Sequence, residues 1–233
     1  MPDSVNPVDR VARALADTVG RSRPRVAADG TDPAIPVAAT VVLVRDGVDG
    51  PEVLLIERPD RGSFAGAWVF PGGKLEPVDA GDGEEVDAAR RAAVRETWEE
   101  TGLVLDPDGL EVLSVWDPPP GIALRIRTWF FVGRAPAAEL ALSAHEAVDA
   151  EWVRPADLLA RHARGGVTLY PPTWVTLHSL EADTTADALV DRVRLADVES
   201  FETVARPGPT LLWRGDAEYD DEADDASRRH RID

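Results

Sequence analysis

The sequence contains no cysteine, a single lysine and no apolar run long enough to cross a membrane. Without cysteine, disulfides, a thiol nucleophile and a thiolate metal site are excluded. No secretory leader pattern opens the chain, so we expect a soluble, cytoplasmic protein. Positive charge is also scarce, with 25 Lys and Arg against 43 Asp and Glu and a net charge of −18. Nucleic acids and anionic membranes are polyanions, so this balance argues against both as partners.

The length of 233 residues and the 44% hydrophobic content allow one domain with extensions. We expect an N-terminal arm and linker over 1–36, a central domain over 37–181, a C-terminal extension packed on it over 182–215, and a charged, disordered tail over 216–233. Helical spacing of apolar residues predicts a short amphipathic helix over 8–19. Such an arm docks on its own domain or on a sister subunit, so a homodimer is one expected assembly.

Strands on either side of a central helix, with further helices after them, predict an α/β/α sandwich. Asp-Gly turn signals between two β-rich runs predict a hairpin, and apolar runs around Arg-Pro-Gly-Pro near the end predict a β-ribbon. The expected strands are 38–44, 52–57, a short strand before Pro71, 110–116, 124–132 and 151–153. The expected helices are 88–101, 155–164, 170–180 and 186–196, and the ribbon is 200–213.

The central helix carries the densest group of candidate catalytic side chains. Good helix formers run from Ala88 to Thr101, and Gly102 is a typical stop. At 100° per residue, Glu96, Glu99 and Glu100 fall on one face. Adjacent like charges destabilise a helix unless a cation lies between them, and carboxylate oxygens suit Mg²⁺ or Mn²⁺. The face therefore predicts a divalent metal site, although such a helix is more often simply a solvated surface.

Two features next to these carboxylates fit the same interpretation. Arg95 stands four residues before Glu99 and can hold its rotamer by a charge-assisted hydrogen bond. Upstream, Phe70-Pro71-Gly72-Gly73 forms a glycine turn whose backbone can approach a metal or a phosphate, which makes the Gly72 carbonyl a candidate ligand. An ordinary tight turn is the alternative.

The run Arg95-Glu96-Thr97-Trp98-Glu99-Glu100-Thr101-Gly102-Leu103, preceded by Phe-Pro-Gly-Gly, resembles the Nudix hydrolase family. The family's box runs Gly, five residues, Glu, seven residues, Arg-Glu, an aliphatic, any residue, Glu-Glu, any residue, Gly, aliphatic. Arg95 lies eight residues too far from Gly73, so the loop holds an insertion. Counting back from Arg95 instead starts the box at Gly81 and places Asp87 where the box has its first glutamate. We interpret Asp87 as the N-cap of the helix, not as a metal ligand.

The resemblance implies a Nudix-type α/β/α sandwich with a mixed sheet, and a hydrolase that cleaves a small-molecule diphosphate with Mg²⁺ or Mn²⁺. It implies catalytic roles for Glu96, Glu100 and Arg95, where Glu96 is either a ligand or the general base. The implied metal ligands are Glu96, Glu99, Glu100 and the Gly72 carbonyl. Family members often bring a further glutamate from a later loop, which makes Glu146 a candidate ligand or simply a solvated residue.

The substrate is the least defined part. The run 58–73, the insertion and the motif 170–174 resemble a Nudix subgroup that includes peroxisomal coenzyme A diphosphatases and their bacterial relatives. Gly62 stands where the dedicated coenzyme A signature has an arginine. Despite this departure, the resemblance to the subgroup makes coenzyme A or an acyl-CoA the favoured substrate, with ADP-ribose or another nucleotide sugar next. The rival class is a non-catalytic Nudix module. Candidate substrate-binding residues are Arg58, Lys74 and Trp68, and candidates to stack on adenine are Trp68, Trp116, Trp129 and Trp174.

Overall fold

The computed structural model describes residues 35–61, 64–121, 125–143, 145–206 and 210–213, together with residues 13 and 21. The arm helix expected over 8–19, apart from residue 13, and the tail over 216–233 lie outside the described residues. In the part of the chain that is described, no helix has the length and apolarity needed to span a membrane.

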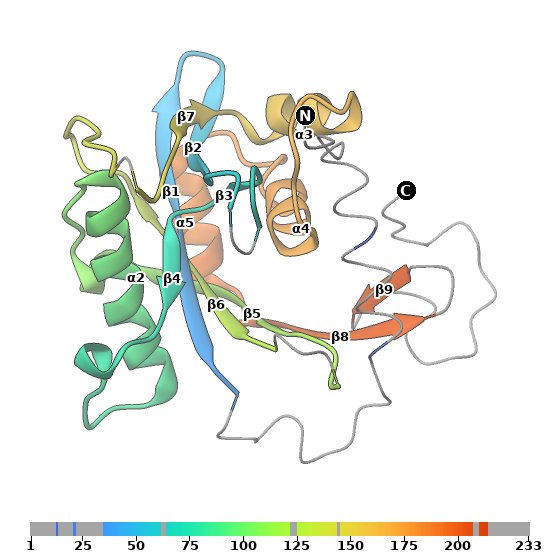
Figure 1. Cartoon of the computed structure of the whole chain (residues 1–233). Coiled ribbons are helices and arrows are strands. Elements are labelled where there is room, and N and C mark those ends of the chain that lie inside the picture. The colour runs from blue at the N-terminus through green and yellow to red at the C-terminus, as the bar shows by residue number, and fades with distance from the viewer. Residues whose placement is uncertain are drawn as a thin grey trace.

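Within the described residues, nine strands form one mixed sheet (Figure 1). They are β1 (Val37–Gly47), β2 (Gly50–Glu57), β3 (Trp68–Val69), β4 (Gly72–Lys74), β5 (Glu111–Asp117), β6 (Arg127–Arg134), β7 (Asp149–Val153), β8 (Glu199–Arg206) and β9 (Thr210–Trp213). The main path is β3-β2-β1-β6-β5-β8-β9, while β4 pairs with β1 and β7 with β2. Because β1 runs antiparallel to β2 but parallel to β6, the sheet is mixed.

Helices cover both faces of this sheet (Figure 1). They are α2 (Glu85–Thr101), α3 (Pro155–Ala163), α4 (Pro171–Ser179) and α5 (Ala186–Leu195), with 3-10 turns η2 (Pro77–Asp79) and η3 (Pro107–Gly109). Alternation along β1 sends Val41 and Leu43 into the core beneath α2, and Val42 and Val44 into the core shared with α3, α4 and α5. The predicted α/β/α sandwich with a mixed sheet is confirmed.

Most predicted elements are present, and several boundaries differ from the prediction by two or three residues. The hairpin β1–β2 and the terminal ribbon β8–β9 pair as expected. The central helix begins at Glu85, three residues before the predicted start. The strand expected over 124–132 instead runs from Arg127 to Arg134, because its pairing with β1 continues to Val44↔Arg134.

Candidate active site

Glu100, on the last turn of α2, is held against the glycine turn. The Gly72 N–H donates to its Oε2 at 2.8 Å, and the residue is 2% exposed. A Cβ at Gly72 would lie 2.2 Å from the Ala39 carbonyl oxygen, so only glycine allows β4 to come this close to β1. Burial raises the pKa of Glu100 to about 8, although the Gly72 N–H and Arg58 oppose this shift. At neutral pH, the buried carboxyl of Glu100 therefore favours its neutral form, and added positive charge nearby would favour the ionised form.

Glu96 lies one turn before Glu100 and packs against the second glycine. A Cβ at Gly73 would stand 2.3 Å from the Glu96 Cδ, so a side chain at this position would displace the carboxylate. Burial raises the pKa of Glu96, while its hydrogen bond from Arg95 lowers it. The two glycines thus let one strand approach two carboxylates of the helix.

Arg95 organises the same surface through five acceptor atoms on four residues. Its Nη1 donates to Glu96 Oε1 at 2.9 Å and to Glu99 Oε2 at 3.1 Å, so the predicted contact with Glu99 is present. Its Nη2 donates to the Lys74 carbonyl at 3.0 Å and to Asp79 Oδ2 at 2.8 Å, and its Nε donates to Asp79 Oδ1 at 3.1 Å. The hydrogen bonds that it donates to Asp79 in particular raise the pKa of Arg95. Arg95 is therefore a fixed cation beside Glu96 and Glu99.

Asp79 is the site residue that our sequence analysis missed. It is 3% exposed, and its pKa lies below the usual value because hydrogen bonds from Arg95 and the Glu76 N–H together outweigh burial, which raises it. Five residues separate it from Gly73, so counting forward from that glycine puts Asp79 at the first glutamate of the Nudix box. The insertion lies between Asp79 and Arg95, and a forward count would have found this residue.

The assignment of Asp87 as the N-cap was wrong. Glu84 is the N-cap, and Asp87 is the third residue of the helix, where its Oδ2 accepts from the Glu84 N–H at 3.0 Å. The two residues form a capping box, in which Asp87 still stabilises the start of the helix. Its position on the first turn keeps it on the opposite end of α2 from Glu100.

The loop before β7 carries Glu146 to the site. The Ser143 N–H donates to the Glu100 carbonyl at 3.0 Å, and the Val148 N–H donates to the Glu57 carbonyl at 2.8 Å. The Glu146 charge raises the pKa of both Glu96 and Glu100, because like charges close together disfavour ionisation. Glu146 thus belongs to the same electrostatic cluster as the helix carboxylates.

The carboxylates supply oxygen donors of the kind that Mg²⁺ and Mn²⁺ prefer. Among the described residues, no three carboxylate or imidazole groups are gathered closely enough to hold one ion as they stand. Arg95 turns Glu96 and Glu99 toward itself, while Gly72 holds Glu100. The donor set fits a divalent cation, provided that Glu96 and Glu99 rotate away from Arg95 to share it with Glu100.

The remaining predicted residues differ in their relation to the site. Arg58 lies beside it, with Nη1 3.8 Å from Glu100 Oε1 and a buried Nε that has no hydrogen-bond partner among the described residues. Lys74 is exposed next to the glycine turn. Trp68 is 6% exposed within the core, beneath the Arg161 guanidinium, so its ring is not open to a ligand.

The other tryptophans have partners within the fold. Trp116 is buried and stacks on Phe201, with ring centroids 4.2 Å apart. Trp129 donates from Nε1 to Glu85 Oε1 at 2.8 Å. Trp174 is half-buried and packs edge-on against His178. Of the four predicted stacking residues, Trp129 and Trp174 keep part of their surface exposed.

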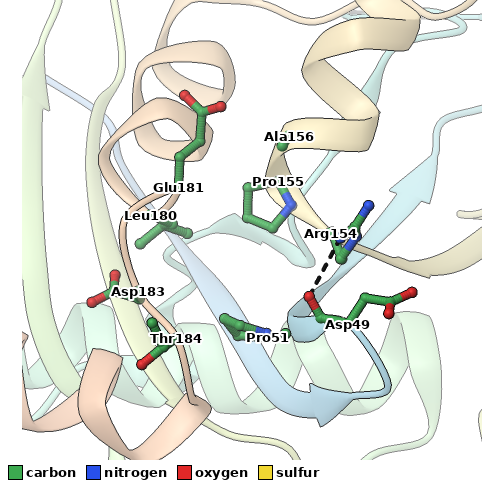
Figure 2. Close-up of a pocket in the computed structure, with 10 residues that line it drawn as sticks. Asp49, Pro51, Arg154, Pro155, Ala156, Leu180, Glu181, Asp183 and Thr184 are labelled. Carbon is green, nitrogen blue, oxygen red and sulfur yellow. Dashed lines mark hydrogen bonds between the residues drawn. The ribbon is translucent and has the colours of Figure 1, made fainter.

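A cavity of about 390 Å³ lies away from these carboxylates (Figure 2). It is lined by the β1–β2 turn, the start of α3 and the segment after α4, including Asp49, Arg154 and Glu181. None of the predicted site residues lines it, so the cavity is not part of the candidate active site.

Comparison with known proteins agrees with this geometry. The model of the NUDIX domain matches residues 34–171. The chain is 32% identical over 118 residues to the CTP pyrophosphohydrolase of Escherichia coli, covering 51% of this chain and 75% of that protein.

Solved structures share the fold. A NUDIX hydrolase from Alicyclobacillus acidocaldarius superposes with a TM-score of 0.62 at 24% identity, covering 70% of this chain and 98% of that one. The NUDIX domain of Shewanella oneidensis NrtR, solved with ADP-ribose, superposes with a TM-score of 0.51 at 18% identity, covering 78% and 98%. The matched family model, the related hydrolase and the fold together show that this chain belongs to the Nudix family and is a hydrolase.

Proposed function

We propose that the chain is a divalent-metal-dependent enzyme that cleaves the diphosphate bond of a nucleoside diphosphate linked to another moiety, with coenzyme A or an acyl-CoA as the favoured substrate. The observation that carries the proposal is Glu100, a buried carboxyl held by the Gly72 N–H within a cluster of carboxylates. Carboxylates in such a cluster repel a polyphosphate unless a cation lies between them.

Glu96, Glu99, Glu100 and Glu146 would hold the cation, together with the Gly72 carbonyl. When bound, a divalent cation offsets negative charge on the phosphoryl oxygens and lowers the pKa of water. Nudix hydrolases generally use such ions, and we propose Mg²⁺ or Mn²⁺ here.

The protein's own groups supply position and proton transfer. Gly72 fixes Glu100 from the strand side, and Arg95 fixes Glu96 and Glu99 from the helix side. Glu96 either serves as a ligand or accepts the proton of the attacking water, since its raised pKa brings it closer to the operating pH. Hydrolysis then places one phosphate on each product.

Arg58 and Lys74 are proposed to bind the substrate's phosphates. Arg58 reaches the edge of the carboxylate cluster, and its Nε has no hydrogen-bond partner among the described residues. Lys74 adds an exposed cation beside the glycine turn. The predicted role of Trp68 is withdrawn because its ring lies in the core.

Coenzyme A is favoured because the segments 58–73 and 170–174 and the insertion resemble the coenzyme A diphosphatase subgroup. ADP-ribose or another nucleotide sugar is next, since it shares the ADP moiety. A nucleoside triphosphate is the alternative class of substrate, and the 32% identity to a CTP pyrophosphohydrolase supports it.

A product assay separates these substrates. Purified protein is incubated with coenzyme A, acetyl-CoA, ADP-ribose or CTP, each with Mg²⁺, Mn²⁺ or excess chelator, and the products are identified by mass spectrometry. We expect coenzyme A to give 3′-phospho-AMP and phosphopantetheine, and the reaction to stop in chelator. Faster CTP conversion to CMP and pyrophosphate would assign the alternative class, and no hydrolysis of any of the four would contradict the proposal.

A further inference from the structure

The loop that carries Glu146, residues 141–148 without the undescribed residue 144, bridges the helix and the sheet. On the helix side, the Ala141 N–H donates to the Thr101 carbonyl at 2.8 Å, next to the contact between Ser143 and Glu100. On the sheet side, the Val148 N–H donates to the end of β2. These contacts join backbone groups at the two ends of the loop. Between them, the Glu146 N–H donates to the Ser143 carbonyl at 3.0 Å, while Glu146 itself is exposed.

Arg61 reaches this middle stretch with its side chain. Its Nη2 donates to the His145 carbonyl at 2.9 Å. This carbonyl belongs to the peptide that joins His145 to Glu146, so the hydrogen bond acts on the backbone immediately before the glutamate. Arg61 follows β2 in the same segment as Arg58, which lies 3.8 Å from Glu100. One short segment thus touches both the helix carboxylates and the loop that faces them.

We propose that Arg61 is a positioning residue for Glu146: by holding the His145 carbonyl, it fixes the peptide from which the Glu146 side chain approaches Glu96 and Glu100. Partners that orient metal ligands contribute to affinity and activity although they do not touch the ion. The inference rests on the proposed function, because the role of Glu146 as a ligand is itself part of that proposal.

A double-mutant cycle tests the inference. The variants are Arg61→Ala, Arg61→Lys, Glu146→Gln and the combination of Arg61→Ala with Glu146→Gln. Two quantities are measured for each: the affinity for Mn²⁺, from free Mn²⁺ by electron paramagnetic resonance, and kcat/KM for the best diphosphate substrate. We expect Arg61→Ala to lower both by about tenfold. Arg61→Lys keeps a donor and should lose less, and Arg61→Ala should add little once Glu146 is already replaced.

Arg154→Ala is the matched control. Arg154 also donates to a loop carbonyl, that of Asp49 at 3.3 Å, at the cavity rather than at the carboxylates (Figure 2). A general effect of losing an arginine-to-loop hydrogen bond would appear in this variant too, and we expect neither quantity to change.

Three results would overturn the inference: unchanged Mn²⁺ affinity in Arg61→Ala, a fully additive loss in the double variant, or a silent Glu146→Gln. Failure of the proposed function has a different signature, which is a wild-type protein without activity on any diphosphate. In that case the Mn²⁺ affinities still complete the cycle, because they need no turnover.

Discussion

Glu100 is a carboxyl group whose surroundings favour its neutral form. Burial raises its pKa to about 8, Glu96 and Glu146 add to the rise, and the Gly72 N–H and Arg58 offset only part of it. A divalent cation would favour the ionised form, so binding of Mg²⁺ or Mn²⁺ is expected to release a proton below this pKa. A raised pKa of this kind is what a buried metal ligand would show before its ion is bound.

The raised pKa of Glu100 predicts how stability depends on pH in excess chelator. From its ordinary pKa of 4.5 up to about 8, the folded protein holds a proton that the unfolded chain has released. The free energy of unfolding therefore falls as pH rises through this window, by on the order of 3 kcal/mol. Glu100→Gln should flatten this decline, and urea unfolding at pH 5 and pH 8 measures it. The exposed Glu139→Gln is the control; equal slopes in all three proteins would contradict the assignment.

Asp79 predicts a second effect, which acts through Arg95. Asp79→Ala removes two of the acceptors of the Arg95 guanidinium, so we expect a loss of about 2 kcal/mol in stability and about tenfold in kcat. Asp79→Asn keeps one acceptor and should lose less in both. Thermal unfolding and steady-state kinetics give the two quantities, and an Asp79→Ala variant with wild-type kcat would show that Arg95 needs no support.

The sequence made the helix carboxylates and the contact of Arg95 with Glu99 predictable, but not the contact of Arg95 with Asp79. Glu96, Glu99 and Glu100 follow from helical periodicity alone. Asp79 meets Arg95 only because η2 folds back under the helix, and the insertion between them hid the spacing. The burial of Trp68 likewise depends on packing beneath α3, which no local pattern shows.

At the scale of the element, α2 is fixed at both ends. Glu85, on its first turn, accepts from Trp129 Nε1 and Arg127 Nη1 of β6, while Thr101 and Glu100, on its last turn, accept from the Glu146 loop. The carboxylate face therefore keeps a defined distance from the glycine turn. The predicted start of α2 was three residues late because glutamate is a poor N-cap type, and the capping box compensates through Asp87.

The capping box predicts distinct effects of two Asp87 variants. Asp87→Ala removes the acceptor for the Glu84 N–H and should cost about 1 kcal/mol of stability. Asp87→Asn retains an acceptor and should lose only the favourable charge at the helix N-terminus, a few tenths of a kcal/mol. In both variants, activity titrated against Mg²⁺ should follow the wild-type curve. A shift of the curve to higher Mg²⁺ in Asp87→Asn would instead make Asp87 a metal ligand.

Elements with strong periodicity were the easiest to predict, and pairing partners were the hardest. The hairpin, α2 to α5 and the ribbon all follow local patterns. The parallel pairing of β1 with β6, and of β5 with β8, joins segments far apart in the sequence and decides where β6 ends. The pairing partners and the end of β6 can therefore be read only from the assembled sheet.

For the whole molecule, the two cores on either face of the sheet hold the carboxylate cluster at one end of α2. The net charge of −18 makes the protein a poor ligand for polyanions, so a charged diphosphate needs local positive charge to approach. Arg58, Lys74 and a bound cation would supply it. The homodimer, the cytoplasmic location and the domain limits stay predictions from the sequence.

The most direct test of a metal-dependent hydrolytic centre on α2 is the turnover of the best diphosphate substrate by the wild type and by Glu99→Gln and Glu100→Gln, at saturating Mn²⁺ and in excess chelator. Each substitution removes the charge of a proposed ligand and keeps the side-chain shape, so we expect at least about a hundredfold loss of kcat with an unchanged circular dichroism spectrum. The wild type should lose its activity in chelator and regain it with Mn²⁺. Undiminished hydrolysis in chelator, with near-native rates in both variants, would contradict the account.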